Sequence, residues 1–220
     1  MELNSIKSEL PTEFYQILEK EITSLRPAQK KAVEKGLLQG RNLLVCTPTA
    51  SGKTLIAELA ALKSIVSGKG KAIYIVPLKA LASEKYRDFK RKYDKIIKVA
   101  LSIGDVDSDD QYLAEYDLII TTSEKFDSLI RHHAPWLSNT ATIVIDEIHL
   151  LNDPKRGPTL EILLTILMQL LKNAQIIALS ATIGNAQELA DWLNAELVTD
   201  NWRPVKLHKG IYFDGKIEFY

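Results

Sequence analysis

Short apolar runs alternate with segments of helical periodicity along most of this chain, and this alternation is the strongest constraint on its fold. The apolar runs are continuous and rich in β-branched residues, which is typical of strands buried on both faces. Strands that alternate with helices form parallel crossover units. The sequence therefore predicts an α/β fold, a three-layer sandwich around a mostly parallel sheet. The predicted strands are residues 42–47, 72–76, 98–102, 117–122, 142–146 and 175–180, and the predicted helices are residues 54–67, 78–93, 123–131, 159–171 and 185–193.

The two ends of the chain depart from this alternation. Near the start, LPTEFYQILEK has the apolar spacing of a short amphipathic helix, and a second helix is predicted to begin at Pro27. Beyond Leu193 the pattern changes to an exit strand, a linker and the opening hairpin of another unit. We expect three parts: an N-terminal helical extension over residues 1–24, a main domain over residues 25–198, and an exit linker with the start of a next domain over residues 199–220.

Length and composition limit the class of protein. A chain of 220 residues suffices for one domain with appendages, and its 28 basic and 28 acidic residues cancel, so net charge points to no particular partner. The single cysteine, Cys46, excludes a disulfide framework and fits a reducing compartment. The N-terminus lacks the apolar core of a signal peptide, and no run is long enough to span a bilayer. We expect a cytoplasmic, soluble monomer without a membrane partner.

The stretch TPTASGKT lies between a predicted strand and a predicted helix, the context that a phosphate-binding loop requires. Backbone N–H groups at the start of that helix would face phosphates, Lys53 would reach the β- and γ-phosphates, and Thr54 would bind Mg²⁺. A chance Gly-Lys-Thr at a helix start is the alternative. The predicted nucleotide-binding residues of this loop are Thr47, Pro48, Thr49, Ala50, Ser51, Gly52, Lys53 and Thr54.

This loop is poor in glycine. The general pattern has glycine where this chain has Thr47, and related loops often have glycine where it has Ala50. The glycine before the lysine is kept as Gly52, and it allows the backbone to approach phosphates without a Cβ atom. An alanine at position 50 is tolerated if its φ is negative. The substitutions therefore do not remove the prediction of nucleotide binding.

The run TIVIDEIH places Asp146 and Glu147 at the carboxyl end of a predicted buried strand. In a parallel sheet this is the edge from which the phosphate-binding loop also emerges. Asp146 is predicted to hold Mg²⁺, and Glu147 to orient or deprotonate an attacking water. Two solvated acids at a strand end are the alternative, but two independent motifs at one sheet edge favour an NTPase. Lys53, Asp146 and Glu147 are the predicted catalytic residues.

With these residues in place, the chain resembles the superfamily-two DExH-box helicases. TPTASGKT, DEIH and Ser180-Ala181-Thr182 are similar to their motifs I, II and III, in the family's order. LRPAQ resembles the family's Q motif, and PLKALASEK, SIGD and TTSEKFDSL resemble motifs Ia, GD and Ib. The residues within these motifs are most similar to those of the superkiller-like branch, which includes the archaeal DNA-repair helicases. The resemblance covers nearly the whole chain and implies the first RecA-like domain of a P-loop NTPase motor.

The resemblance also implies roles for further residues. Gln29 would read the adenine of ATP by a two-point hydrogen bond, with a surface glutamine in a helix as the alternative. His149, Ser180, Ala181 and Thr182 would couple the γ-phosphate state to the rest of the motor. The residues that would line a tract for a single strand's backbone are Pro77, Lys79, Ala80, Gly104, Asp105, Thr121, Thr122 and Lys125. Taken singly, these residues also fit helix caps and turns.

The implied function is that of an ATP- and Mg²⁺-dependent DNA helicase motor that acts on single-stranded or forked DNA, in repair at stalled forks. An RNA helicase of the same branch is the alternative, and a nucleotide-responsive binding module is an alternative from another class. In the family a second RecA-like domain supplies arginine fingers, and such a finger contributes roughly 10³- to 10⁵-fold in rate. We therefore expect this chain alone to bind nucleotide weakly, to hydrolyse it slowly and not to unwind a duplex.

Overall fold

The computed structural model describes residues 1–104, 110–206 and 208–219. Its main feature is a seven-stranded sheet in the order β3-β4-β2-β5-β6-β1-β7, in which every pairing is parallel. The strands are β1 (Leu43–Cys46), β2 (Lys71–Val76), β3 (Val99–Ser102), β4 (Leu118–Thr122), β5 (Thr140–Ile145), β6 (Gln175–Ser180) and β7 (Glu196–Thr199). The predicted α/β sandwich with a parallel sheet is confirmed.

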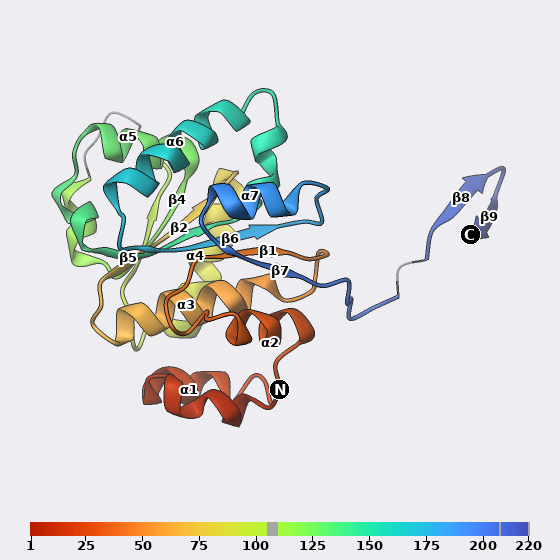
Figure 1. Cartoon of the computed structure of the whole chain (residues 1–220), viewed down its shortest axis with the longest axis horizontal. Helices are drawn as coiled ribbons and strands as arrows, with labels where there is room; N and C mark the ends of the chain where they lie inside the picture. The colour runs from red at the N-terminus through yellow and green to blue at the C-terminus, as the bar shows by residue number, and fades with distance from the viewer. Residues whose placement is uncertain (105–109, 207, 220) are drawn as a thin grey trace.

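Helices cover both faces of the sheet (Figure 1). The α-helices are α1 (Thr12–Leu18), α2 (Pro27–Glu34), α3 (Lys53–Val66), α4 (Lys79–Tyr93), α5 (Ser123–Arg131), α6 (Gly157–Leu170) and α7 (Ala186–Trp192). Short 3₁₀ helices are η1 (Leu3–Glu9), η2 (Gln111–Glu115), η3 (Pro135–Asn139) and η4 (Ile148–Asn152). Helices α1 to α4 share one apolar cluster with the sheet, and α5 to α7 share the other.

The strand β1 shows why continuous apolar runs were a reliable signal. Leu43 and Val45 belong to the cluster under α1 to α4, whereas Leu44 and Cys46 belong to the cluster under α5 to α7. Successive side chains of a strand point to opposite faces, so a strand between two helical layers needs apolar residues at every position. All four residues are buried, two in each apolar cluster.

Helix α6 begins two residues before its predicted start at Thr159. The carboxylate of Asp153 accepts hydrogen bonds from the backbone N–H groups of Lys155 and Arg156, at 2.8 and 2.9 Å, and so fixes the turn that leads into the helix. A Cβ at Gly157 would lie 2.1 Å from the carbonyl oxygen of Leu151, so this close approach requires glycine. The turn and the glycine together allow the helix to begin at Gly157, two residues before the start that the spacing of its apolar residues predicts.

The N-terminal segment packs on the main domain. Leu3, Ile6, Phe14 and Leu18 are buried in the same apolar cluster as α3. The backbone N–H of Leu25 donates to the carbonyl of Met1 at 2.8 Å, which closes the segment on itself. Residues 1–24 therefore form an added helical layer that shares the core of the sandwich.

A partly buried ion cluster joins this layer to helices α3 and α4. Lys92 Nζ lies 2.8 Å from the Glu58 carboxylate and 2.6 Å from that of Glu21, which follows α1. The Tyr93 hydroxyl also donates to Glu58. Burial opposes the charge on Lys92, but the two carboxylates outweigh it and raise the pKa of Lys92 above 10.5. The lysine is therefore the neutralising centre of the cluster.

We expect Lys92→Met to lower the free energy of unfolding by about 2 to 3 kcal/mol, because it leaves the Glu58 carboxylate buried without its cation. Chemical denaturation monitored by circular dichroism measures this change. Arg91→Met is the matched control, since Arg91 is 81% exposed and its pair with Asp88 is a surface pair. That control should change stability by less than about 0.5 kcal/mol. Equal effects of the two substitutions would contradict this account.

The C-terminal residues leave the sandwich after β7. This strand pairs with β1 in parallel, as the predicted exit strand, and the chain then runs to an antiparallel hairpin of β8 (Gly210–Phe213) and β9 (Lys216–Phe219). The hairpin stands away from the sandwich in Figure 1, and all eight of its strand residues are exposed. None of the helices in the described ranges has the length and apolar character of a membrane span.

Candidate functional site

The carboxyl ends of the parallel strands bring the sequence motifs to one edge of the sheet. The loop 47–52 follows β1, and Asp146 with Glu147 follows β5. Strand β6 lies between β1 and β5, and Ala181 and Thr182 follow it at the same edge. Residues more than 90 positions apart in sequence thus meet where ligands of open α/β sheets bind.

The phosphate-loop sequence forms a tight turn that ends at the first residue of α3. Gly52 has φ of 91°, and a Cβ there would lie 2.5 Å from Nε2 of Gln29. Lys53 Nζ donates to the carbonyl of Thr47 at 2.8 Å, so its ammonium folds back over the loop. The hydroxyls of Thr47 and Ser51 are 2.8 Å apart, while Pro48 is buried and Thr49 is exposed. The lysine and the helix start therefore face the same turn.

Ala50 corrects one expectation. Its φ is 66°, in the left-handed region, rather than negative. The arginine side chain at position 26 stabilises this conformation, because Arg26 Nη1 donates to the carbonyl of Ala50 at 2.9 Å. An L-residue in this region costs about 1 to 2 kcal/mol, and only glycine avoids that cost. The loop therefore has the backbone of a glycine-rich loop at position 50 without the glycine.

We expect Ala50→Gly to raise the free energy of unfolding by about 0.5 to 1 kcal/mol, because relief of the strain exceeds the added flexibility of the unfolded chain. Gly52→Ala should have the opposite effect, since its Cβ would meet Gln29 and its φ is positive. Thermal and chemical denaturation of both variants checks the pair. Destabilisation by Ala50→Gly would show that the alanine methyl group matters more than the strain.

The carboxylate of Asp146 is held in place by its neighbours. Its Oδ2 accepts from the hydroxyl of Tyr74 at 3.0 Å, and its Oδ1 accepts from the backbone N–H of Glu147 at 3.1 Å. Burial, then the charge of Asp146, raise the pKa of Tyr74 well above 10.0, so this phenol stays protonated as a donor. Tyr74 lies on β2 as part of an apolar run, and sequence reasoning assigned it no role at the site.

The charges of Lys53 and of the two carboxylates interact electrostatically. Burial lowers the pKa of Lys53 below 10.5, whereas the charges of Glu147 and then Asp146 act in the opposite direction. Glu147 itself has φ of 54°, in the left-handed region, so its backbone turns sharply after Asp146. Its side chain is 37% exposed, so solvent can reach it. The site thus combines the half-buried cation of Lys53 with one anchored and one accessible carboxylate.

A second lysine lies between the two residues predicted to bind Mg²⁺. Lys85 Nζ, from α4, donates to Thr54 Oγ1 at 3.0 Å and lies 3.8 Å from Asp146 Oδ2. A cation thus already fits between these two oxygens. No cluster of three or more His, Cys, Asp or Glu side chains converges within the described ranges. Mg²⁺ beside a nucleotide needs no such cage, because it keeps waters and phosphate oxygens as ligands. The residues present therefore fit this metal.

Gln29 faces the loop. Its Oε1 accepts from the backbone N–H of Arg26 at 2.8 Å, and its Nε2 donates to the carbonyl of Gly52 at 3.0 Å. The residue is 3% exposed. In this structure both ends of the amide that would read adenine are bonded to backbone, and one of these bonds ties α2 to the phosphate loop.

The contact between the DEIH and SAT segments joins a backbone N–H to an imidazole ring. The N–H of Ala181 lies 3.4 Å from His149 Nδ1, and Glu147 Oε2 lies 3.3 Å from the same nitrogen. An unprotonated Nδ1 accepts from the amide, and a protonated one donates to the carboxylate, so the two bonds exclude each other. The Ser180 side chain is buried beside the Cys46 thiol at the end of β1, and Thr182 is exposed.

The residues predicted to contact nucleic acid fall into two groups. Lys79 and Ala80, in the first turn of α4, and Gly104 are exposed, and Pro77 is half-buried. By contrast, Thr121, Thr122 and Lys125 are 0%, 3% and 2% exposed. Thr122 caps α5, and Lys125 Nζ pairs with Asp110 at 3.0 Å. The first group is thus at least partly exposed and the second is buried, while Asp105 lies outside the described residues.

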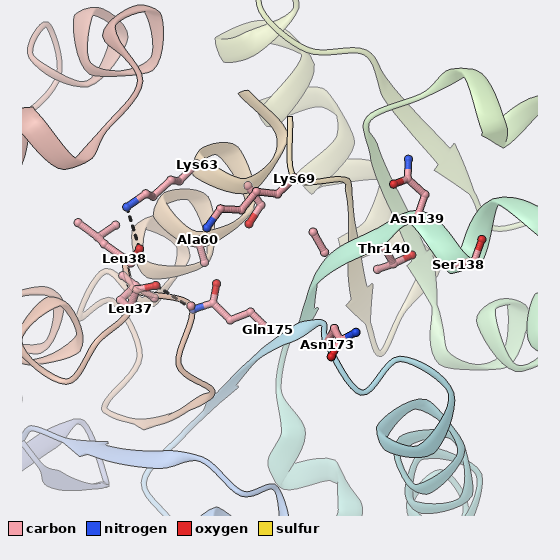
Figure 2. Close-up of a pocket in the computed structure, with 13 residues that line it drawn as sticks. Leu37, Leu38, Ala60, Lys63, Lys69, Ser138, Asn139, Thr140, Asn173 and Gln175 are labelled. Atoms are coloured by element: carbon pink, nitrogen blue, oxygen red, sulfur yellow. Dashed lines mark hydrogen bonds between the residues drawn. The ribbon is translucent and has the colours of Figure 1, made fainter. Parts of the chain in front are cut away.

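A hollow of about 290 Å³ lies at the opposite, amino-terminal edge of the sheet. Figure 2 shows Thr140 and Gln175, from the starts of β5 and β6, together with Lys63 and Lys69. Two of its polar groups already bond to backbone: Lys63 Nζ donates to the carbonyl of Leu38, and Gln175 Nε2 to that of Leu37. No carboxylate is among its described lining residues. This hollow is therefore separate from the nucleotide motifs.

A parallel sheet with a Gly-Lys-Thr loop and an Asp-Glu pair at one edge defines a RecA-like α/β domain. The family profile of the DEAD/DEAH box helicases matches residues 26–189. The chain belongs to this family.

Named relatives and a solved structure agree with this assignment. The ATP-dependent DNA helicase Hel308 of Methanocaldococcus jannaschii is 58% identical over 205 residues, which cover 90% of this chain and 17% of the relative. Hel308 of Pyrococcus abyssi is 55% identical over 197 residues, or 90% of this chain and 27% of the relative. The chain thus spans about a quarter or less of these relatives. The DUF1998 helicase MrfA bound to DNA superposes with a TM-score of 0.76 at 29% identity, over 88% of this chain and 30% of MrfA.

Proposed function

We propose that this chain is the ATP-binding motor domain of an ATP-dependent DNA helicase. The observation that carries the proposal is the meeting of Lys53, Asp146 and Glu147 at one sheet edge, in a chain of the DEAD/DEAH box helicase family. The names of the relatives, both DNA helicases, and the DNA in the MrfA structure support DNA rather than RNA as the track. A role in DNA repair at stalled forks belongs to the same proposal.

Each residue of the site has a proposed task. The loop Thr47–Thr54 and the start of α3 bind the phosphates, and Lys53 supplies the positive charge. Gln29 fixes the loop through its hydrogen bond to the carbonyl of Gly52. Thr54 and Asp146 hold Mg²⁺, which when bound neutralises charge on the phosphates. Glu147 orients and deprotonates the attacking water, since its carboxylate is accessible. His149 and the SAT segment, Ser180, Ala181 and Thr182, relay the state of the site.

The nucleic-acid tract is proposed along the same sheet edge. The exposed residues Lys79, Ala80 and Gly104, with the half-buried Pro77, contact the strand's backbone. The buried residues Thr121, Thr122 and Lys125 shape the turn below them, and Asp105 completes the tract in the proposal. Residues 25–198 are the first RecA-like domain, with 1–24 as a helical extension and 199–220 as the linker to a second RecA-like domain.

The experiment is to measure ATP turnover by the chain with single-stranded DNA, with RNA of matched sequence, and with neither. We expect ATP binding that needs Mg²⁺, and slow turnover that DNA raises more than RNA. Lys79→Glu is expected to weaken this stimulation without weakening ATP binding, because Lys79 is exposed outside the phosphate loop. Stimulation by RNA alone would overturn the DNA assignment. Absence of ATP binding would overturn the proposal as a whole.

A further inference from the structure

The charge and position of Lys85 do not follow from the roles that the family's motifs imply. Lys85 lies on α4, six residues after Lys79, so the two side chains point about 120° apart around the helix. Lys79 is exposed, whereas the Lys85 side chain is only 19% exposed. One helix therefore presents one lysine to solvent and another to the nucleotide site.

The contacts of Lys85 are with the proposed metal ligands. Its ammonium donates to Thr54 Oγ1 at 3.0 Å and lies 3.8 Å from Asp146 Oδ2. It also lies 5.7 Å from the centre of the Tyr74 ring, whose hydroxyl bonds the same Asp146 oxygen. Three different elements, α3, β2 and the end of β5, thus converge on one tethered positive charge.

This position cannot hold two cations at once. Mg²⁺ binds oxygen at about 2.0 to 2.1 Å and needs the lone pairs of its ligands. The Thr54 hydroxyl already accepts from Lys85, and the Asp146 carboxylate lies beside the same ammonium. A divalent ion between these oxygens would also be repelled by an ammonium a few ångströms away.

We propose that Lys85 is a built-in cation that occupies the Mg²⁺ position in the nucleotide-free protein and must withdraw before Mg²⁺ binds there. The inference rests on the proposed ATP and Mg²⁺ site. It adds that the Lys85 ammonium competes with Mg²⁺ for this position. Lys85 is a positioning residue: it keeps Thr54 and Asp146 together when no metal is bound. Its withdrawal changes a contact of α4, the helix whose first turn carries Lys79 and Ala80, and so links the nucleotide site to the proposed DNA tract.

The test measures the Mg²⁺ dependence of ADP binding, with a fluorescent ADP analogue titrated at a series of Mg²⁺ concentrations. Lys85→Met removes the competing charge, and we expect it to lower the half-saturating Mg²⁺ concentration about ten-fold. Lys85→Arg keeps the charge and should stay within about two-fold of the wild-type chain. Binding of Mn²⁺ measured by electron paramagnetic resonance gives a direct readout that needs no turnover.

Lys90→Met is the matched control, because Lys90 lies on the same helix, is exposed and contacts Tyr86 instead of the site. It should leave the half-saturating Mg²⁺ concentration unchanged. Lys85→Gln serves as a second variant, because it keeps a polar end that can bond Thr54 and guards against misfolding of the methionine variant. Circular dichroism confirms that each variant is folded.

The outcomes separate the inference from the function on which it rests. If the half-saturating Mg²⁺ concentration for ADP binding is unchanged or higher in Lys85→Met and Lys85→Gln, Lys85 only supports the fold and the inference is overturned. If the wild-type chain binds no ADP at any Mg²⁺ concentration, the proposed function fails, and the inference fails with it. A lower half-saturating Mg²⁺ concentration in Lys85→Met and Lys85→Gln, but not in Lys90→Met, supports the proposal that Lys85 competes with Mg²⁺.

Discussion

Lys53→Met should abolish most nucleotide binding while leaving the folded chain as stable as before or slightly more stable. The lysine is the cation of the loop, and a hydrogen bond to a charged group contributes about 1.5 to 3 kcal/mol, or roughly ten- to a hundred-fold in the dissociation constant. In the structure its ammonium donates to the Thr47 carbonyl, a bond within the loop itself. Titration with a fluorescent ATP analogue measures the loss of binding, and thermal denaturation measures stability.

The stability half of this prediction follows from the pKa of Lys53. Burial lowers that pKa below its ordinary value of 10.5. Folding therefore disfavours the protonated amine at every pH below the lowered pKa, and this penalty disappears as the pH rises above the ordinary value. At neutral pH the wild-type chain carries the full penalty, and the methionine variant does not.

Lys63→Met is the matched control for Lys53→Met. Lys63 also lies on α3, also has a pKa lowered by burial, and also donates to a backbone carbonyl, that of Leu38. It lies at the other end of the helix, beside the hollow of Figure 2. We expect nucleotide binding to be unchanged in this variant. Equal loss of binding in the two variants would show that the effect comes from α3 as a whole.

Glu147→Gln should slow ATP hydrolysis about 10²- to 10⁴-fold while leaving ATP binding close to that of the wild-type chain. Glutamine has the shape of glutamate but cannot take a proton from water. Binding is expected to survive because Lys53, Thr54 and Asp146 are untouched. Single-turnover hydrolysis with protein in excess over ATP, in the presence of single-stranded DNA, measures the chemical step even when it is slow.

The control for Glu147→Gln is Glu161→Gln, an exposed position on α6. It makes the same chemical change on an exposed side chain outside the nucleotide motifs, and hydrolysis should not respond. Undiminished turnover by Glu147→Gln would remove Glu147 from the catalytic step and would favour a binding module whose response to nucleotide does not depend on this carboxylate.

The arrangement of the motifs could be predicted from sequence because it depends on the spacing of apolar residues and on the order of strands and helices along the chain. Continuous apolar runs such as Leu43–Cys46 predict strands buried on both faces, and parallel strands bring the loops at their carboxyl ends to a single edge. Gly52 was expected to let the backbone approach phosphates without a Cβ atom. Its φ is 91°, and a Cβ there would lie 2.5 Å from Nε2 of Gln29. These features are local or depend on topology alone.

The partners of individual side chains could not be predicted in the same way. Lys85 was visible only as the last residue of PLKALASEK, and nothing local indicates that its ammonium reaches Thr54, 31 positions earlier. Lys125 is a charged residue on a helix of mixed polarity, yet it is 2% exposed because Asp110 neutralises it. The φ of Ala50 likewise depends on Arg26, which belongs to another element. Such details are set by tertiary packing.

The position of β1 in the sheet has a consequence for the order in which the chain folds. Its two neighbours are β6 and β7, so Leu43 is paired with Ile177 and Glu196, residues far later in the sequence. During synthesis from the N-terminus, the strand that leads into the phosphate loop has neither partner until most of the chain has been made. Contacts of such long sequence separation form slowly. We therefore expect the nucleotide site to be among the last parts of this domain to become native.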